Sequence, residues 1–440
     1  MSALQNFPYF PIEFTKEGQV FNPAQVEALV TGLKPTAATD LLVLSHGWNN
    51  DMQDAQSLYE AFLGAFRQVL DGPVRQAFTQ RKFAVLGVLW PSKKFADSQL
   101  IPSGAASASA PISNALLTAA LDHLRGTFDA PGADQALEQA RALVPSLEDS
   151  PKAQEKFAEL LRSVLPATEA SPDVDASAAF RTLPGQELMT RLAKPFPATL
   201  LPQAQTHGPA AGLGPGFVGQ GAGLAQFFGG IKAGALNLLN YTTYYQMKER
   251  AGRVGRDGLY AVLQRVQQQC PLKLHLAGHS FGARLVTAAA DKEGQPPLIV
   301  HTLTLLQAAF SHYGFSDNYD GTQAGFFRRV LTRHVVKGPI LVSHSVRDTA
   351  VGTMYPLASM LARQVGQSLG DAHSKYGGLG RNGAQKTPES ISGALLPVGA
   401  SYAFRGGSIF NLNADAIIQG HSDISHPEVA YALLQAIATT

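Results

Sequence analysis

The chain has one cysteine, no long apolar run and little net charge, and each shortage excludes a class of protein. Cys270 is the only cysteine in 440 residues, which excludes an internal disulfide and a cysteine-rich metal site. No uninterrupted apolar run is long enough to span a bilayer, so no transmembrane segment is expected. The formal net charge is +2 and basic residues do not cluster with aromatic ones, so we expect no nucleic-acid partner.

The N-terminus also lacks the features of a secretory signal. Residues 2–8 contain neither a basic segment nor an apolar core, so we expect a cytoplasmic protein, although export without a signal would leave no trace in the sequence. Hydrophobic residues make up 45% of the chain and charged residues 15%, which favours a large buried core over disorder.

Short apolar strands alternate with helical patterns along most of the chain. Residues 40–45 contain a continuous apolar run, Leu41–Leu44, and residues 83–90 form a second one. Such runs are typical of strands buried on both faces of a parallel sheet. Further strands are predicted at residues 9–15, 298–306, 339–345 and 408–418, and in the short apolar stretch that begins at residue 272. Helices are predicted at residues 23–32, 51–70, 257–269, 323–334, 355–364 and 427–438, and from residue 281 onward. This alternation predicts an α/β protein with a doubly wound, mostly parallel sheet. The stretch 371–397 is rich in Gly and Ser and is predicted to be a loop.

Residues 92–250 interrupt the alternation and are too many for a simple loop. The first part is rich in Ala, with helical patterns at residues 115–125, 134–143 and 153–165, and the last part is apolar and rich in Gly. The segment leaves the carboxyl end of the strand ending at Trp90, the edge where open α/β sheets bind ligands. We therefore predict a core of residues 1–91 and 251–440, and a mainly helical cap, or lid, of residues 92–250.

The pentapeptide Gly278-His279-Ser280-Phe281-Gly282 lies between a predicted strand and a predicted helix. A Gly-x-Ser-x-Gly sequence in this context is typical of a nucleophile elbow, a turn too tight for side chains at its flanking positions. The two glycines remove the clashing Cβ atoms, which leaves Ser280 at the apex with a strained backbone and an exposed hydroxyl. A structural serine in a chance turn is the alternative.

A nucleophilic serine needs a general base, and that base needs a carboxylate to hold it. Asp348 lies just past the strand at residues 339–345, and His421 lies just past the last strand. The alternative acids are Asp317 and Asp320, which follow the strand at residues 298–306. Asp348 could instead cap a helix.

The alternative base is His426, whose place before Pro427 suits a helix start. We expect His279 to pack the elbow rather than to take part in catalysis.

The two histidines of residues 421–426 lack a supporting ligand cluster, so no metal is predicted. Two Gly-x-Gly-x-x-Gly matches, at residues 214–219 and 378–383, do not follow predicted strands, so we expect no dinucleotide and no other cofactor.

His46-Gly47-Trp48 follows the strand at residues 40–45, where a backbone N–H can point into an oxyanion hole. The donors we predict are the amides of Trp48 and Phe281, and His46 and Gly47 would lie beside the substrate. Together with the Ser, Asp and His above, in that chain order, this set resembles an α/β-hydrolase of the lipase/esterase type. The resemblance covers the sheet and its helices, but not the insertion.

The resemblance implies a serine hydrolase that works through a Ser–His–Asp triad and an acyl-enzyme. Residues 217–245 are apolar with few charges, so Phe227 and Phe228 are predicted to line an acyl pocket, although a helix packed on the sheet would show the same pattern. The expected substrate is a small-molecule or lipid-like ester with an apolar acyl group, reached in part through peripheral contact with lipid surfaces. An amide or peptide hydrolase with the same triad and a non-catalytic binding scaffold are the alternatives.

Overall fold

The computed structural model describes residues 2–48, 50–92, 112–165, 177–193, 230–348 and 377–440. The chain divides into two compact units. The first consists of Met1–Ser92, Glu249–Val351 and Gly378–Thr440, and the remaining residues form the second. Within the part of the chain described, no helix is both long and apolar enough to cross a membrane.

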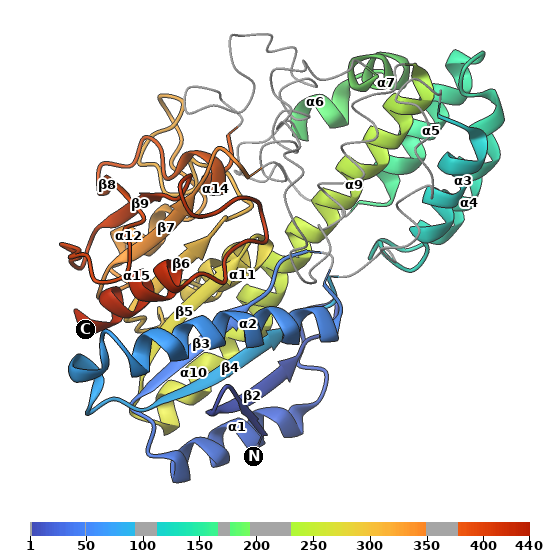
Figure 1. The fold of residues 1–440 in the computed structure, drawn as a ribbon. Helices are drawn as coiled ribbons and strands as arrows, with labels where there is room; N and C mark the ends of the chain where they lie inside the picture. Colours follow the sequence, from blue (N-terminus) through green and yellow to red (C-terminus); the bar gives the residue numbers. More distant parts are fainter. Residues whose placement is uncertain (1, 49, 93–111, 166–176, 194–229, 349–376) are drawn as a thin grey trace, which may run out of the picture. The chain divides into compact units, whose positions relative to one another are not determined.

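The first unit is built on one mixed, mostly parallel sheet, which agrees with the predicted α/β class (Figure 1). In the described residues the sheet has nine strands in the order β1-β2-β4-β3-β5-β6-β7-β9-β8. The strands are β1 (Ser2–Leu4), β2 (Phe7–Glu13), β3 (Asp40–Ser45), β4 (Phe83–Leu89), β5 (Lys273–His279), β6 (Thr302–Leu306), β7 (Ile340–His344), β8 (Ser390–Ala394) and β9 (Ile409–Asn413). Only β1 runs antiparallel to its neighbour among these pairs, so the carboxyl ends of β2 to β9 share one edge.

Two helices, α2 (Met52–Asp71) and α15 (Pro427–Ala438), contact each other on one face of this sheet. Helix α2 begins at a capping box, in which the side chains of Asp51 and Asp54 each accept a hydrogen bond from the other residue's backbone N–H at 2.8 and 3.0 Å. Leu42 of β3 belongs to the hydrophobic cluster that these two helices cover.

The other face carries α1 (Pro23–Thr36), α10 (Tyr260–Gln269) and α11 (Phe281–Ala290). Because side chains alternate along a strand, Leu41 and Val43 of β3 point to this face, and both are fully buried. The sheet is thus buried on both faces, as the continuous apolar strands predict.

The regular structure of the described residues between β4 and β5 is helical, in agreement with the mainly helical insertion that the sequence predicts. Its helices are α3 (Asn114–His123), α4 (Ala133–Leu143), α5 (Pro151–Ser163), α6 (Ser177–Thr182), α7 (Gly185–Leu192) and α9 (Ile231–Arg253), followed by a π-helical turn (Val254–Leu259) before α10. In the second unit, α3 packs on α4, α4 on α5 and α5 on α7. Leu117, Leu137, Phe157 and Leu188 form part of its buried core.

The predicted loop at residues 371–397 differs from the structure. Its described part contains a short helix, α14 (Leu379–Asn382), and the edge strand β8. Strand β8 forms through parallel pairing with β9, with Ser390 opposite Ile409. That pairing partner is distant in the sequence, and the Ser- and Gly-rich strand itself shows no apolar alternation.

Three other elements are much shorter than predicted. The strand expected at residues 298–306 is confined to β6, the strand expected at residues 408–418 is confined to β9, and the helix expected at residues 323–334 is reduced to α12 (Arg328–Thr332). The predicted helix at residues 355–364 lies outside the described residues.

Candidate active site

Ser280 forms the turn between β5 and α11. Its backbone has φ 57° and ψ −123°, a region that residues with a side chain rarely adopt. A Cβ atom on Gly278 would lie 2.4 Å from the carbonyl oxygen of Gly282, and one on Gly282 would lie 2.2 Å from that of Ser45. The turn therefore requires glycine at both flanking positions, and the second glycine also lets α11 approach the end of β3.

His421 lies between Ser280 and Asp348. Its Nε2 is 2.7 Å from Ser280 Oγ, and its Nδ1 is 2.9 Å from Asp348 Oδ2. Because an ionised carboxylate only accepts hydrogen bonds, Nδ1 carries the imidazole proton and Nε2 accepts from the serine hydroxyl. Asp348 is fully buried, whereas the His421 side chain is 19% exposed. The structure thus brings together three residues that lie far apart in the sequence.

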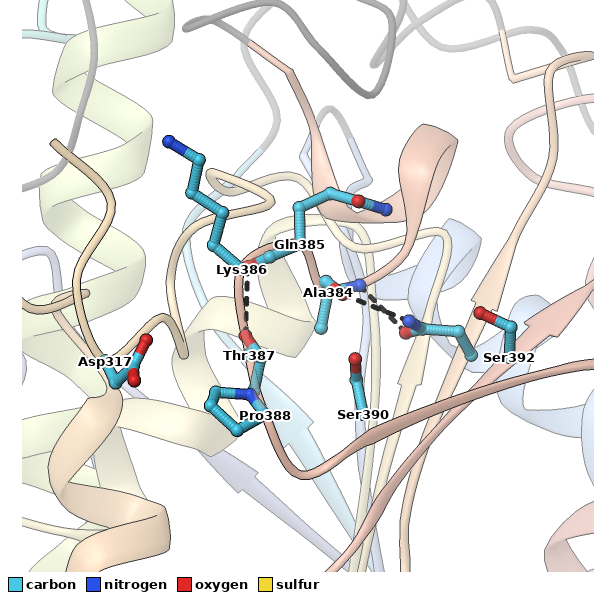
Figure 2. Close-up of a pocket in the computed structure, with 9 residues that line it drawn as sticks. Asp317, Ala384, Gln385, Lys386, Thr387, Pro388, Ser390 and Ser392 are labelled. Atoms are coloured by element: carbon cyan, nitrogen blue, oxygen red, sulfur yellow. Dashed lines mark hydrogen bonds between the residues drawn. The ribbon is translucent and has the colours of Figure 1, made fainter.

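The alternative acids have other partners. Asp320 accepts hydrogen bonds from the backbone N–H groups of Thr322 and Gln323 at 2.9 and 2.8 Å, which stabilise its own loop. Asp317 lines a polar cavity of about 400 Å³, together with Lys386 and Ser390 (Figure 2). The residues lining this cavity include none of Ser280, Asp348 and His421, so it is not the cleft of the candidate site.

The alternative base, His426, occupies the N-cap position of α15. Its Nε2 is 2.7 Å from Asp423 Oδ1, three residues earlier on the same loop. In this arrangement His426 lies at the start of α15 and contacts Asp423, whereas His421 contacts Ser280.

His46 holds the loop that follows β3. Its Nε2 accepts the backbone N–H of Trp90 at 3.3 Å, its Nδ1–H donates to the carbonyl of Gly47 at 2.9 Å, and its ring stacks on the Trp90 indole. The Tyr59 hydroxyl accepts the backbone N–H of His46 at 2.9 Å. Burial lowers the pKa of His46 to about 4, so the ring is neutral. Both of its nitrogens face protein groups, which fixes the loop beside the serine.

Gly47 lets this loop pass directly over Ser280. A Cβ atom on Gly47 would lie 2.7 Å from the Cβ of Ser280 and 3.2 Å from its Oγ. The next residue, Trp48, is buried, and its ring centroid is 6.1 Å from that of Phe281. Phe281 begins α11, so its N–H lies at the positive end of the helix dipole. The amides of Trp48 and Phe281 remain the predicted oxyanion donors.

His279 contacts the candidate base rather than the nucleophile. Its Nε2 is 2.8 Å from the carbonyl oxygen of His421, and the two ring centroids are 4.8 Å apart. Burial, together with the neighbouring His421, lowers the pKa of His279 to about 3. The neutral ring therefore donates its Nε2–H to this carbonyl. His279 thus packs at the turn and also fixes the backbone of His421 through this hydrogen bond.

Sequence reasoning missed Gln307, whose Nε2 is 3.3 Å from Asp348 Oδ2. Gln307 follows β6 directly, so the rule that selected Asp348, a polar residue just past a strand, could have found it. Phe227 and Phe228 lie outside the described residues. Among the described residues, no group of three or more His, Cys, Asp or Glu side chains could hold a metal ion.

Comparisons of the chain with family models, with curated proteins and with solved structures found no match.

Proposed function

We propose that this protein is a serine hydrolase that cleaves carboxylic esters on an α/β-hydrolase fold. The observation that carries the proposal is the hydrogen-bonded series Ser280–His421–Asp348, with the serine on a strained turn between a strand and a helix. A serine, a histidine and a buried carboxylate in this arrangement form the constellation that activates a hydroxyl for attack on an acyl group.

The positions of the three residues in the fold support the same proposal. Ser280 follows β5, Asp348 follows β7 and His421 follows β9, and these strands run parallel in one sheet. Parallel strands place their carboxyl ends at one edge, where open α/β sheets bind ligands. The chain order Ser, Asp, His is that of α/β-hydrolases.

In the proposed mechanism, His421 Nε2 takes the proton of Ser280 as Oγ attacks the ester carbonyl carbon. The amides of Trp48 and Phe281 stabilise the negative oxygen of the tetrahedral intermediate. The C–O bond to the alcohol then breaks, and the alcohol leaves with the proton from His421. Water, deprotonated by the same imidazole, hydrolyses the acyl-enzyme. Asp348 stays ionised and holds the Nδ1 proton throughout.

The proposed substrate is an ester with an apolar acyl group, from a small molecule to a lipid. This part rests on the apolar composition around Phe227 and Phe228 and on the point where the insertion leaves the sheet, after β4. We propose that the insertion acts as a cap over the acyl group and that it makes peripheral contact with lipid surfaces.

A fluorophosphonate probe tests the proposal directly, because it reacts with an activated serine. We expect covalent labelling of the wild-type protein at Ser280, and turnover of p-nitrophenyl esters faster than that of matched p-nitroanilides. Faster turnover of the anilides would favour an amide hydrolase. A folded protein that neither labels nor turns over any of these substrates would favour a non-catalytic scaffold.

A further inference from the structure

Gln307 is a buried hydrogen-bond donor to the carboxylate of the proposed triad. It follows β6 and is fully buried, and its Nε2 lies 3.3 Å from Asp348 Oδ2. The same oxygen accepts the Nδ1–H of His421 at 2.9 Å. One carboxylate oxygen thus receives two N–H donors, one from the imidazole and one from a neutral amide. A buried carboxylate needs such donors, because it has lost its water.

The neighbours of Gln307 determine which end of its amide faces Asp348. Its Nε2 also lies 3.4 Å from the carbonyl oxygen of Gly380. A carboxylate and a carbonyl only accept hydrogen bonds, so the NH₂ group must be the end that faces them. On the other side, Ser343 Oγ donates to Gln307 Oε1 at 3.0 Å and accepts the Gln307 backbone N–H at 3.2 Å. Ser343 on β7 therefore holds the amide in its working orientation.

The backbone at this position is unfavourable for a residue with a side chain. Gln307 has φ 45°, in the left-handed region that favours glycine. The neighbouring segment packs tightly against it, since a Cβ atom on Gly380 would lie 2.3 Å from the carbonyl carbon of Gln307. Glycine would remove the strain at position 307, but it would also remove the side-chain contacts with Asp348, Gly380 and Ser343. Gln307 therefore keeps an unfavourable backbone conformation at a position where its side chain bonds to Asp348 and Ser343.

We infer that Gln307 is a positioning residue for catalysis, which holds the carboxylate of Asp348 so that Oδ2 faces Nδ1 of His421. Because the amide is neutral, it supports the carboxylate without adding a second charge beside the imidazole. Ser343 acts through Gln307. The inference rests on the proposed function and deepens it, because it extends the catalytic series by two residues, to Ser280–His421–Asp348–Gln307–Ser343.

The substitution Gln307→Met keeps the length of the side chain and removes both polar atoms. We expect kcat for p-nitrophenyl esters to fall about ten- to hundredfold, the range for loss of a hydrogen bond to a charged group. KM should stay within about twofold, because Gln307 bonds to the carboxylate rather than to the substrate. Thr304→Val is the matched control on β6, since the Thr304 hydroxyl is buried and has no described hydrogen-bond partner. Its kcat should stay within about twofold of wild type.

A double-mutant cycle separates a positioning role from a merely structural one. Ser343→Ala should lower kcat about three- to tenfold, as expected for loss of a neutral hydrogen bond. The double variant should be no slower than Gln307→Met alone, because the serine acts only through the glutamine. Losses that multiply independently, or a Gln307→Met variant with wild-type kcat, would overturn the inference. If Gln307→Met does not fold, the single variant Ser343→Ala decides: a lower kcat at unchanged KM supports the inference, and an unchanged kcat overturns it.

Labelling of the wild-type protein shows whether a negative result contradicts the role of Gln307 alone or the proposed function as a whole. A wild-type protein that does not react with the fluorophosphonate contradicts the serine hydrolase itself. A wild-type protein that reacts and turns over esters, with Gln307→Met equally fast, leaves the hydrolase in place and removes only the role of Gln307.

Discussion

His279 donates its Nε2–H to the backbone carbonyl of His421 at 2.8 Å, so the residue before the nucleophile holds the residue that would deprotonate it. The two histidines are 142 positions apart in the sequence, and Ser280 and His421 are 141 positions apart. Because this bond involves the backbone, it fixes the position of the imidazole while leaving both of its nitrogens for Ser280 and Asp348.

Ser280→Ala should abolish ester hydrolysis and fluorophosphonate labelling. The nucleophile is then absent, and kcat should fall by about 10⁴- to 10⁶-fold, with the remainder due to the oxyanion donors and binding. Circular dichroism and the thermal midpoint should match those of the wild type. Labelling of this variant at the wild-type rate would place the nucleophile elsewhere.

His421→Ala and His426→Ala should behave differently. The first removes the base and should be nearly as slow as Ser280→Ala. The second removes only the partly exposed pair with Asp423, and such pairs contribute about 0–1 kcal/mol to the free energy of unfolding. His426→Ala should therefore keep most of its kcat and lose little stability in urea. The reverse order of activities would move the base to His426.

Two buried histidines, His46 and His279, should make the fold sensitive to acid. In the folded protein the pKa values of His46 and His279 lie below their ordinary value of 6.5, so between that value and about 3 to 4 the unfolded chain binds more protons. Their contribution to stability is complete above pH 6.5 and is lost as the pH falls through this window.

Urea unfolding at pH 7 and pH 5 measures this effect. Each histidine should lower the free energy of unfolding by up to about 1.4 kcal/mol per pH unit within its window. His46→Gln should show a smaller difference between the two pH values than the wild type, whatever its stability at pH 7. A wild-type protein that becomes more stable on acidification would contradict the neutral, buried state of these rings.

Replacing Phe227 and Phe228 together by Ser should slow hydrolysis of long-chain esters more than that of acetates. Each methylene that loses apolar burial weakens binding by up to about 0.8 kcal/mol, so the penalty in kcat/KM should grow with acyl length. A series of p-nitrophenyl esters from acetate to palmitate provides the measurement. An equal loss along the series would mean that the two residues do not line the acyl site.

The residues of the proposed triad could be predicted because each has a local signal. The glycines around Ser280 mark a tight turn, and Asp348 and His421 follow predicted strands. Gln307 also follows a predicted strand, but nothing local marks it as a partner of Asp348, and Tyr59 lies within a helix. The roles of both depend on contacts between segments that are distant in the sequence.

The same distinction applies to the fold. The buried strands β3 and β4 are visible as apolar runs, whereas β8 exists only through its pairing with β9. The sequence pattern therefore predicts elements whose stability is encoded locally, and it misses those that a neighbour induces.

The distribution of the three residues over β5, β7 and β9 has a consequence during synthesis of the chain. Strand β9 takes its place beside β7, and His421 follows it by eight positions in the printed sequence. A nascent chain on the ribosome already carries the elbow and Asp348, but it has no base until β9 has emerged and docked. The proposed nucleophile would thus stay inert throughout the earlier steps of folding, when its surroundings are still open to solvent and to other chains.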